Sequence, residues 1–164
     1  MKTALEILQV LQEEFPGRLV KSELNVADPF AVVECGAILE VCTFLKNNHD
    51  MAFDTLACLS GVDYEGFKGE PERMEVVYPI ICSPMKLRHK FVLKGELPRE
   101  NPSLSTVEGI WTNGNWHERK VYDMFGIRFE GHSDLRRILC PDDSEGYPLR
   151  KDYEQSESYS RHAG

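Results

Sequence analysis

The sequence lacks the motifs that mark most metal, nucleotide and catalytic sites. Its five cysteines are widely spaced and form no C-x-x-C pair, so we expect reduced thiols, most of them in the core, rather than a zinc site, an iron-sulfur cluster or disulfides. No G-x-G-x-x-G or G-x-x-x-x-G-K-[ST] loop occurs. His117 and Glu118 begin an H-E-x-x-H pattern, but Val121 stands at its fifth position. We therefore expect no catalytic residue, metal site or cofactor site in this chain.

The sequence also lacks long apolar runs and an excess of positive charge. Its apolar runs are only a few residues long, whereas a membrane-spanning helix needs roughly 20. Glu6 and Gln9 interrupt the apolar core that a signal peptide requires, so we expect a cytoplasmic protein. The formal net charge of −8 argues against nucleic acid as a partner, because proteins that bind nucleic acid carry a basic surface.

What is present predicts one globular body. A chain of 164 residues with 41% apolar residues can bury a core without disulfides or a metal. Helical spacing of apolar residues occurs at 3–15 and 37–47, short Val- and Leu-rich strands are expected at 18–26 and 30–35, and 51–62 is a buried strand or a short helix leading into one. Residues 73–82 and 86–94 are expected to form an antiparallel hairpin around Ser83-Pro84-Met85. This order predicts an α+β fold, with a mostly antiparallel sheet and helices packed on one side.

Two more helices are predicted before the body ends near Gly126. The first spans 104–111, and the second begins one residue after Asn115, which is expected to cap it. Glu118 is placed to reach back to the Asn115 amide in a capping box. Gly126 is expected to end the helix in a left-handed conformation. Arg119 and Asp123, four residues apart, are expected to pair on the helix surface.

The rest of the chain is predicted to be an extended tail, residues 127–164, which follows a globular domain formed by residues 1–126. Within 127–153 five basic residues alternate with acidic and with apolar ones. An isolated segment cannot bury enough apolar surface to offset about 1–2 kcal/mol of ordering entropy per residue. Arginine and tyrosine among apolar anchors are typical of protein interfaces. We expect the tail to order against a partner, with folding back over its own sheet as the alternative.

Residues 118–153, ERKVYDMFGIRFEGHSDLRRILCPDDSEGYPLRKDY, resemble the signature of the 30 kDa subunit family of respiratory complex I, whose bacterial members belong to NADH-quinone oxidoreductase. The family pattern contains G-I, F-x-G-H-P, L-R-R-I-L and G-x-P-L-R-K-D-[YF] in that order. The chain matches it at Glu118, Arg119, Asp123, Phe125, Gly126, Ile127, Phe129, Gly131, His132, Leu135, Arg136, Arg137, Ile138, Leu139, Gly146, Pro148, Leu149, Arg150, Lys151, Asp152 and Tyr153. It departs at Lys120, Ser133, Ser144 and Glu154, which leaves open which of the related complexes the chain serves.

This resemblance implies a non-catalytic structural subunit of the peripheral, hydrophilic arm of a proton-pumping NADH:quinone oxidoreductase. Such a subunit lies on the cytoplasmic side of the inner membrane and touches the membrane only through the complex. FMN, iron-sulfur clusters and quinone would belong to the parent complex, with no cofactor in this chain. The implied partners are the 49 kDa-type large subunit, which the tail would contact next to the quinone site, and neighbouring iron-sulfur subunits. The expected interface residues are Glu118, Arg119, Asp123, Phe129, His132, Leu135, Arg136, Arg137, Ile138, Pro148, Leu149, Arg150, Lys151, Asp152 and Tyr153.

Other interpretations stay open at this stage. The chain resembles equally the small subunit of a related membrane-bound hydrogenase or of another proton-pumping dehydrogenase complex. A free adaptor would share the adhesive tail but has no reason to match so long a signature. A stand-alone enzyme would need a poised thiol, a metal set or a nucleotide loop, and the sequence offers none of these.

Overall fold

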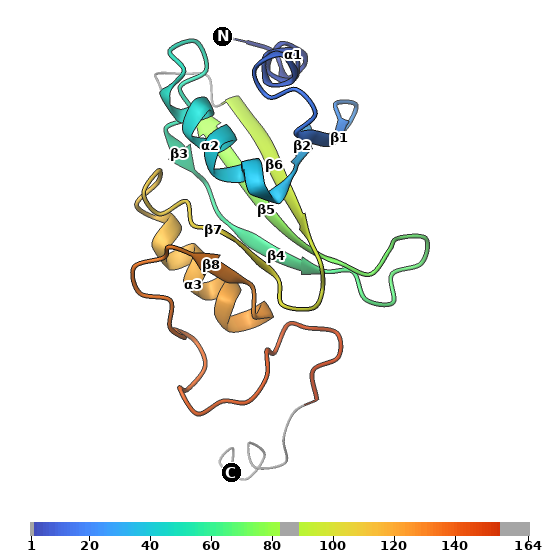
Figure 1. The fold of residues 1–164 in the computed structure, drawn as a ribbon, viewed down its shortest axis with the longest axis vertical. Helices are drawn as coiled ribbons and strands as arrows, with labels where there is room; N and C mark the ends of the chain where they lie inside the picture. Colours follow the sequence, from blue (N-terminus) through green and yellow to red (C-terminus); the bar gives the residue numbers. More distant parts are fainter. Residues whose placement is uncertain (1, 83–88, 155–164) are drawn as a thin grey trace.

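A six-stranded sheet forms the centre of the fold (Figure 1). The computed structural model describes residues 2–82 and 89–154. The strand order is β1-β2-β6-β5-β3, and β4 also pairs with β5. Every pair is antiparallel except β2 with β6, which is parallel. The strands are β1 (Leu19–Glu23), β2 (Phe30–Val33), β3 (Thr55–Leu56), β4 (Ser60–Asp63), β5 (Met74–Cys82) and β6 (His89–Leu97).

Helices α1 (Ala4–Glu14) and α2 (Ile38–Asn47) pack on one face of this sheet, and the 3-10 turn η1 (Cys35–Ala37) leads into α2. Alternate residues of β5 face the helices because side chains of a strand point to opposite faces in turn. Of these, Met74, Val76, Tyr78 and Ile80 are fully buried in the same core as the apolar side of both helices. The predicted α+β fold, the mostly antiparallel sheet and these two helices are therefore confirmed.

Charged side chains cover the opposite face of β5 and β6. Glu75, only 2% exposed, accepts a hydrogen bond from Lys94 Nζ at 3.0 Å and lies 4.0 Å from Arg73 Nη2. The Arg73 guanidinium in turn lies 3.9 Å from the centre of the Tyr64 ring. Long aliphatic stems and one aromatic ring thus shield this face of the sheet while their charges pair.

Helix α3 (Gly114–Phe125) lies beside a small parallel sheet of β7 (Ser103–Ser105) and β8 (Arg128–Glu130). The helix predicted over 104–111 is wrong, because Leu104 pairs with Phe129 of β8, a partner that local sequence does not reveal. Helix α3 also starts earlier than predicted, at Gly114, and its N-terminal residue accepts no side-chain capping bond. Gly126 ends it with φ +73°, as predicted.

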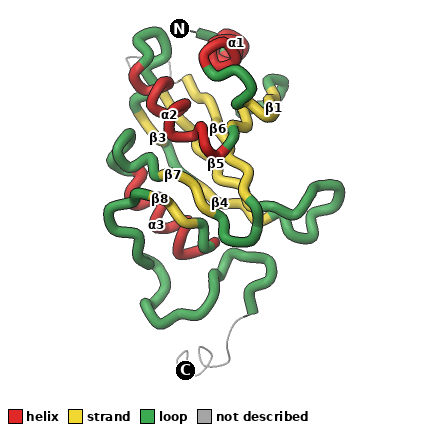
Figure 2. The backbone as a smooth tube through the Cα atoms, in the orientation of Figure 1, coloured by secondary structure: helices red, strands yellow, loops and turns green. Residues whose placement is uncertain are grey.

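The tail beyond β8 contains no helix or strand in its described part, residues 131–154, and runs along the end of the body that α3 and β4 form (Figure 2). The domain division at residue 126 stays a prediction. Phe129, past that boundary, is 2% exposed and packs in the core of the body. The predicted turn Ser83-Pro84-Met85 lies outside the described residues, and β5 and β6 on either side of it pair antiparallel, as predicted.

Candidate partner-docking site

Asp123, in the last turn of α3, fixes the first part of the tail. Its buried Oδ2 accepts the backbone N–H groups of Ile138, Leu139 and Cys140 at 3.1, 2.7 and 2.9 Å, and Oδ1 accepts Arg137 Nη1 at 2.9 Å. Burial opposes ionisation, but these donors outweigh it and lower the pKa of Asp123 to about 2. A side chain of the body therefore determines the path of the tail at this point.

The two neighbouring arginines of the tail have different surroundings. Arg137 is 14% exposed at its side chain and also donates to the carbonyl oxygens of Ser144 at 3.1 Å and Gly146 at 2.8 Å. Arg136 is 70% exposed and pairs only with Asp134, at 3.0 Å. Arg137 thus stabilises the tail internally, whereas Arg136 is available to a partner.

Arg119 does not pair with Asp123 on the helix surface, and that prediction is wrong. Both residues are buried, and Arg119 donates from Nε to the carbonyl oxygen of Arg136 at 3.3 Å and from Nη2 to that of Arg137 at 3.4 Å. Its guanidinium also lies 5.0 Å from the centre of the Trp116 ring. The pairing failed because the tail lies over this side of α3 and supplies other partners for both groups.

Glu118 does not form the predicted capping box. Its carboxylate is fully buried and accepts Val107 N–H at 2.7 Å and Thr106 Oγ1 at 2.5 Å. Burial is the largest influence and raises the pKa of Glu118 to about 7, although both donors act in the opposite direction. Glu118 therefore holds the loop after β7 against α3 instead of binding the helix N-terminus.

His132 and Glu108 attach the start of the tail to the same region. His132 Nδ1 accepts the N–H of Asp134 at 3.0 Å, so its proton is on Nε2, which donates to the carbonyl oxygen of Asn115 at 3.1 Å. Glu108 Oε1 accepts the N–H of Ser133 at 2.7 Å. Residues 132–134 are thereby bound both to α3 and to the loop before it.

Asp63, at the end of β4, fixes the far part of the tail. Its buried carboxylate pairs with Arg99, at 3.0 Å from Nε, and accepts the N–H of Lys151 at 2.9 Å. Burial raises its pKa, but Arg99 and the N–H donors outweigh that influence and lower the pKa to about 2. Arg99 also pairs with Asp152 at 2.9 Å, and Arg150 Nη2 donates to the carbonyl oxygen of Arg99 at 2.6 Å. Three consecutive tail residues are therefore attached to one acid and one arginine of the body.

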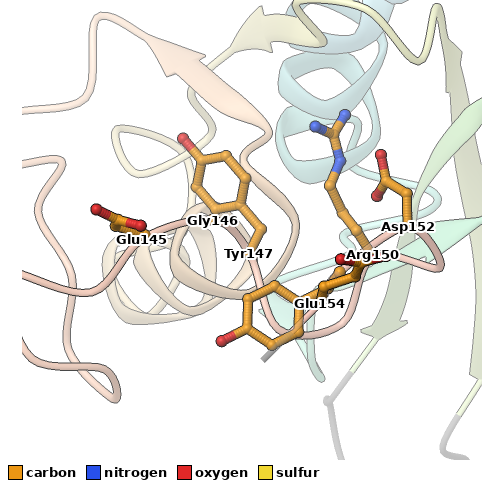
Figure 3. A pocket seen from close by; sticks show the side chains of 7 residues that line it. Glu145, Gly146, Tyr147, Arg150, Asp152 and Glu154 are labelled. Carbon is orange, nitrogen blue, oxygen red and sulfur yellow. The ribbon is translucent and has the colours of Figure 1, made fainter. Parts of the chain in front are cut away.

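A hollow of about 410 Å³ lies within the tail (Figure 3). Tyr147, Tyr153 and Arg150 line it together with acidic side chains. The side chains of Arg150 and Asp152 extend to the same side of the chain there, next to each other. Tyr147 reaches the body, because its ring packs against Gly126, where a Cβ would overlap it.

The predicted interface residues differ in exposure. Among them the buried residues are Glu118, Arg119, Asp123 and Phe129. The half-buried residues are His132, Leu135, Arg137, Ile138, Pro148, Arg150 and Tyr153. The exposed residues are Arg136, Leu149, Lys151 and Asp152. The buried set binds the tail to the body, and their role toward a partner stays a prediction.

Sequence reasoning missed the body residues that receive the tail. Asp63, Arg99 and Glu108 lie in unremarkable surroundings in the sequence, far from the tail positions that they bind. No spacing rule connects residues 88 positions apart. One usable signal was present: Asp63 is an acidic residue at the end of an apolar strand, where a buried carboxylate needs a partner.

The fold and this site together define an α+β domain whose irregular C-terminal segment is attached to the body by buried carboxylates. The model of the respiratory-chain NADH dehydrogenase 30 kDa subunit family matches residues 31–159. The C subunit of the NADH-quinone oxidoreductase of Chlorobium phaeobacteroides is 39% identical over 160 residues, which are 97% of this chain and 93% of that protein. The chain therefore belongs to the complex I 30 kDa subunit family, which is part of NADH-quinone oxidoreductase.

Two solved structures resemble the chain. The trypsin-resistant fragment (1-134) of Nqo5 superposes with a TM-score of 0.67 at 33% identity, over 81% of this chain and all of the fragment. A chain of the archaeal membrane-bound sulfane sulfur reductase superposes with a TM-score of 0.75 over 98% of this chain and 90% of its own length. At 23% identity the second likeness concerns the fold alone. No described helix of the chain has both the length and the apolar character to span a membrane.

Proposed function

We propose that the chain is a non-catalytic structural subunit of the peripheral arm, and that its tail docks onto the 49 kDa-type large subunit next to the quinone site. In this arrangement the chain lies on the cytoplasmic side of the inner membrane and contacts neighbouring iron-sulfur subunits. It holds no cofactor of its own, and electrons pass through other chains.

The observation that carries this proposal is the way the tail is held. Buried Asp123 and Asp63 fix a segment without helix or strand, while Arg136 and Leu149 remain in solvent. A prearranged segment loses less conformational freedom on binding than a disordered one. The tail is therefore suited to bind a large neighbour without the full entropy cost of ordering.

Co-purification from native membranes tests the proposal. The full chain, used as bait, should retain the large subunit in stoichiometric amount together with the iron-sulfur and NADH-oxidising subunits, identified by mass spectrometry. Asp123→Asn should lower the recovery of the large subunit because it loosens the tail, whereas Asp134→Asn changes an exposed pair and should not. Recovery of none of these subunits with the unaltered chain would refute the proposal.

A second candidate is the equivalent subunit of a related respiratory membrane complex. The fold likeness to the archaeal sulfane sulfur reductase chain favours keeping it. The same experiment separates the two, because recovery of the large subunit with a hydrogenase or another donor module in place of the NADH-oxidising subunits would identify the second.

A further inference from the structure

An apolar groove lies between β4 and α3, where the tail crosses the body. Two hollows of about 130 and 340 Å³ share Gly61, Phe125 and Leu149 in their walls. Gly61 keeps the groove shallow at its centre, since a Cβ there would come within 2.7 Å of the Phe125 ring. The ring therefore lies directly on the strand backbone, and Leu149 of the tail forms the opposite wall.

Three large apolar side chains are exposed along this groove. Phe67 is 60% exposed and Leu149 is 51% exposed, and both line it. Trp116, 64% exposed, lies one helical turn before Lys120 on α3, and Lys120 lines the smaller hollow. A run of exposed apolar side chains around a hollow marks an interaction site, and tryptophan often contributes strongly to binding energy.

The groove carries positive charge on an acidic protein. Lys120 lines one hollow and Lys151 lines the other. Both are exposed, and neither forms an ion pair within residues 2–82 and 89–154. The whole chain has a net charge of −8, so two unpaired lysines beside the same groove favour a ligand with negative charge at both ends.

We propose that this groove binds an apolar segment of the large subunit that has acidic residues on both sides of it. The apolar residues of that segment occupy the hollows over Phe125 and Leu149, and the acidic residues pair with Lys120 and Lys151. The proposal rests on the proposed function, since it names the part of the large subunit that the chain recognises.

Charge reversal tests it on the full chain, with binding to the purified large subunit measured at low and at high salt. Lys120→Glu combined with Lys151→Glu should weaken binding about two- to thirtyfold at low salt, the combined range for two exposed ion pairs. High salt should reduce this difference, because it screens exposed charges. Lys2→Glu combined with Lys21→Glu makes the same change in net charge away from the groove and should leave binding unchanged.

Substitution of the apolar wall gives an independent readout. Trp116→Ala should weaken binding at both salt concentrations, because its contribution is not screened. Thermal unfolding of each variant should match that of the unaltered chain, since all these side chains are exposed. Equal binding by the lysine pair variant and the unaltered chain would overturn the groove proposal, as would a groove that joins two copies of this chain, detected by sedimentation. Failure of the unaltered chain to bind the large subunit would instead refute the proposed function.

Discussion

Replacement of Asp123 by asparagine should release the tail from the body. The asparagine carbonyl oxygen can still accept the N–H groups of residues 138–140, so its amide group must occupy the Oδ1 position and face Arg137, which is also a donor. The drop in the Asp123 pKa from 3.8 to about 2 corresponds to roughly 2.5 kcal/mol. Because Arg137 keeps its carbonyl partners, we expect a loss of about 2–4 kcal/mol, near the lower end for a broken buried pair.

Two measurements check this expectation. Urea unfolding, followed by the fluorescence of buried Trp111, reports the free energy of unfolding of the body. Trypsin cleavage after Arg136 and Arg137 reports local opening of the tail, which should increase at least about thirtyfold for a loss of 2 kcal/mol. Asp134→Asn is the matched control, since its pair with Arg136 is exposed and contributes about 0.5 kcal/mol at most. A cleavage rate no higher in Asp123→Asn than in this control would refute the reasoning.

Three further outcomes are expected. Because the pKa of Glu118 is 4.5 in its ordinary state and about 7 when folded, the folded chain binds more protons between these values and loses stability as pH rises through 7; Glu118→Gln should remove roughly 3 kcal/mol of this dependence in urea unfolding, and parallel pH profiles would contradict it. Arg99→Ala leaves a buried carboxylate without its cation and should cost about 3 kcal/mol or more in thermal unfolding at neutral pH, with a smaller loss as pH falls through about 2; a loss independent of pH would count against the pair. Gly126→Ala should cost more than Gly17→Ala in the same assay, because both have positive φ but only at Gly126 would the new Cβ meet an aromatic ring; equal losses would show that the ring moves freely.

Local patterns were sufficient for the body. Residues 4–14 and 38–47 form helices because apolar side chains recur every three or four positions and face the sheet, as predicted from their spacing alone. Gly126 ended α3 for the same local reason, since glycine adopts φ +73° without steric cost. The alternation of apolar and charged residues in β6 likewise indicated one core face and one charged face.

Distant partners explain the predictions that failed. Residues 104–111 have apolar spacing compatible with a helix, but β7 pairs with β8 and the N–H of Val107 bonds to Glu118. The same carboxylate was expected at the helix N-terminus, where a local rule places it, yet the loop after β7 supplies its donors. For Asp123 and Arg119 the competing partners come from the tail. In each case a hydrogen bond between segments far apart in the sequence replaced a local one.

The attachment of the tail to Asp63 has a consequence for the order of events during synthesis. Lys151 is made 88 residues after Asp63, a delay of roughly 4 to 18 s at about 5–20 residues per second. Arg99 is made after only 36 residues, so the body can neutralise this acid and fold around it while the tail is still absent. Until translation reaches Lys151, the groove beside β4 lacks both Leu149 and the second lysine. Whether the tail or a neighbouring subunit reaches that surface first is thus decided by timing at the ribosome.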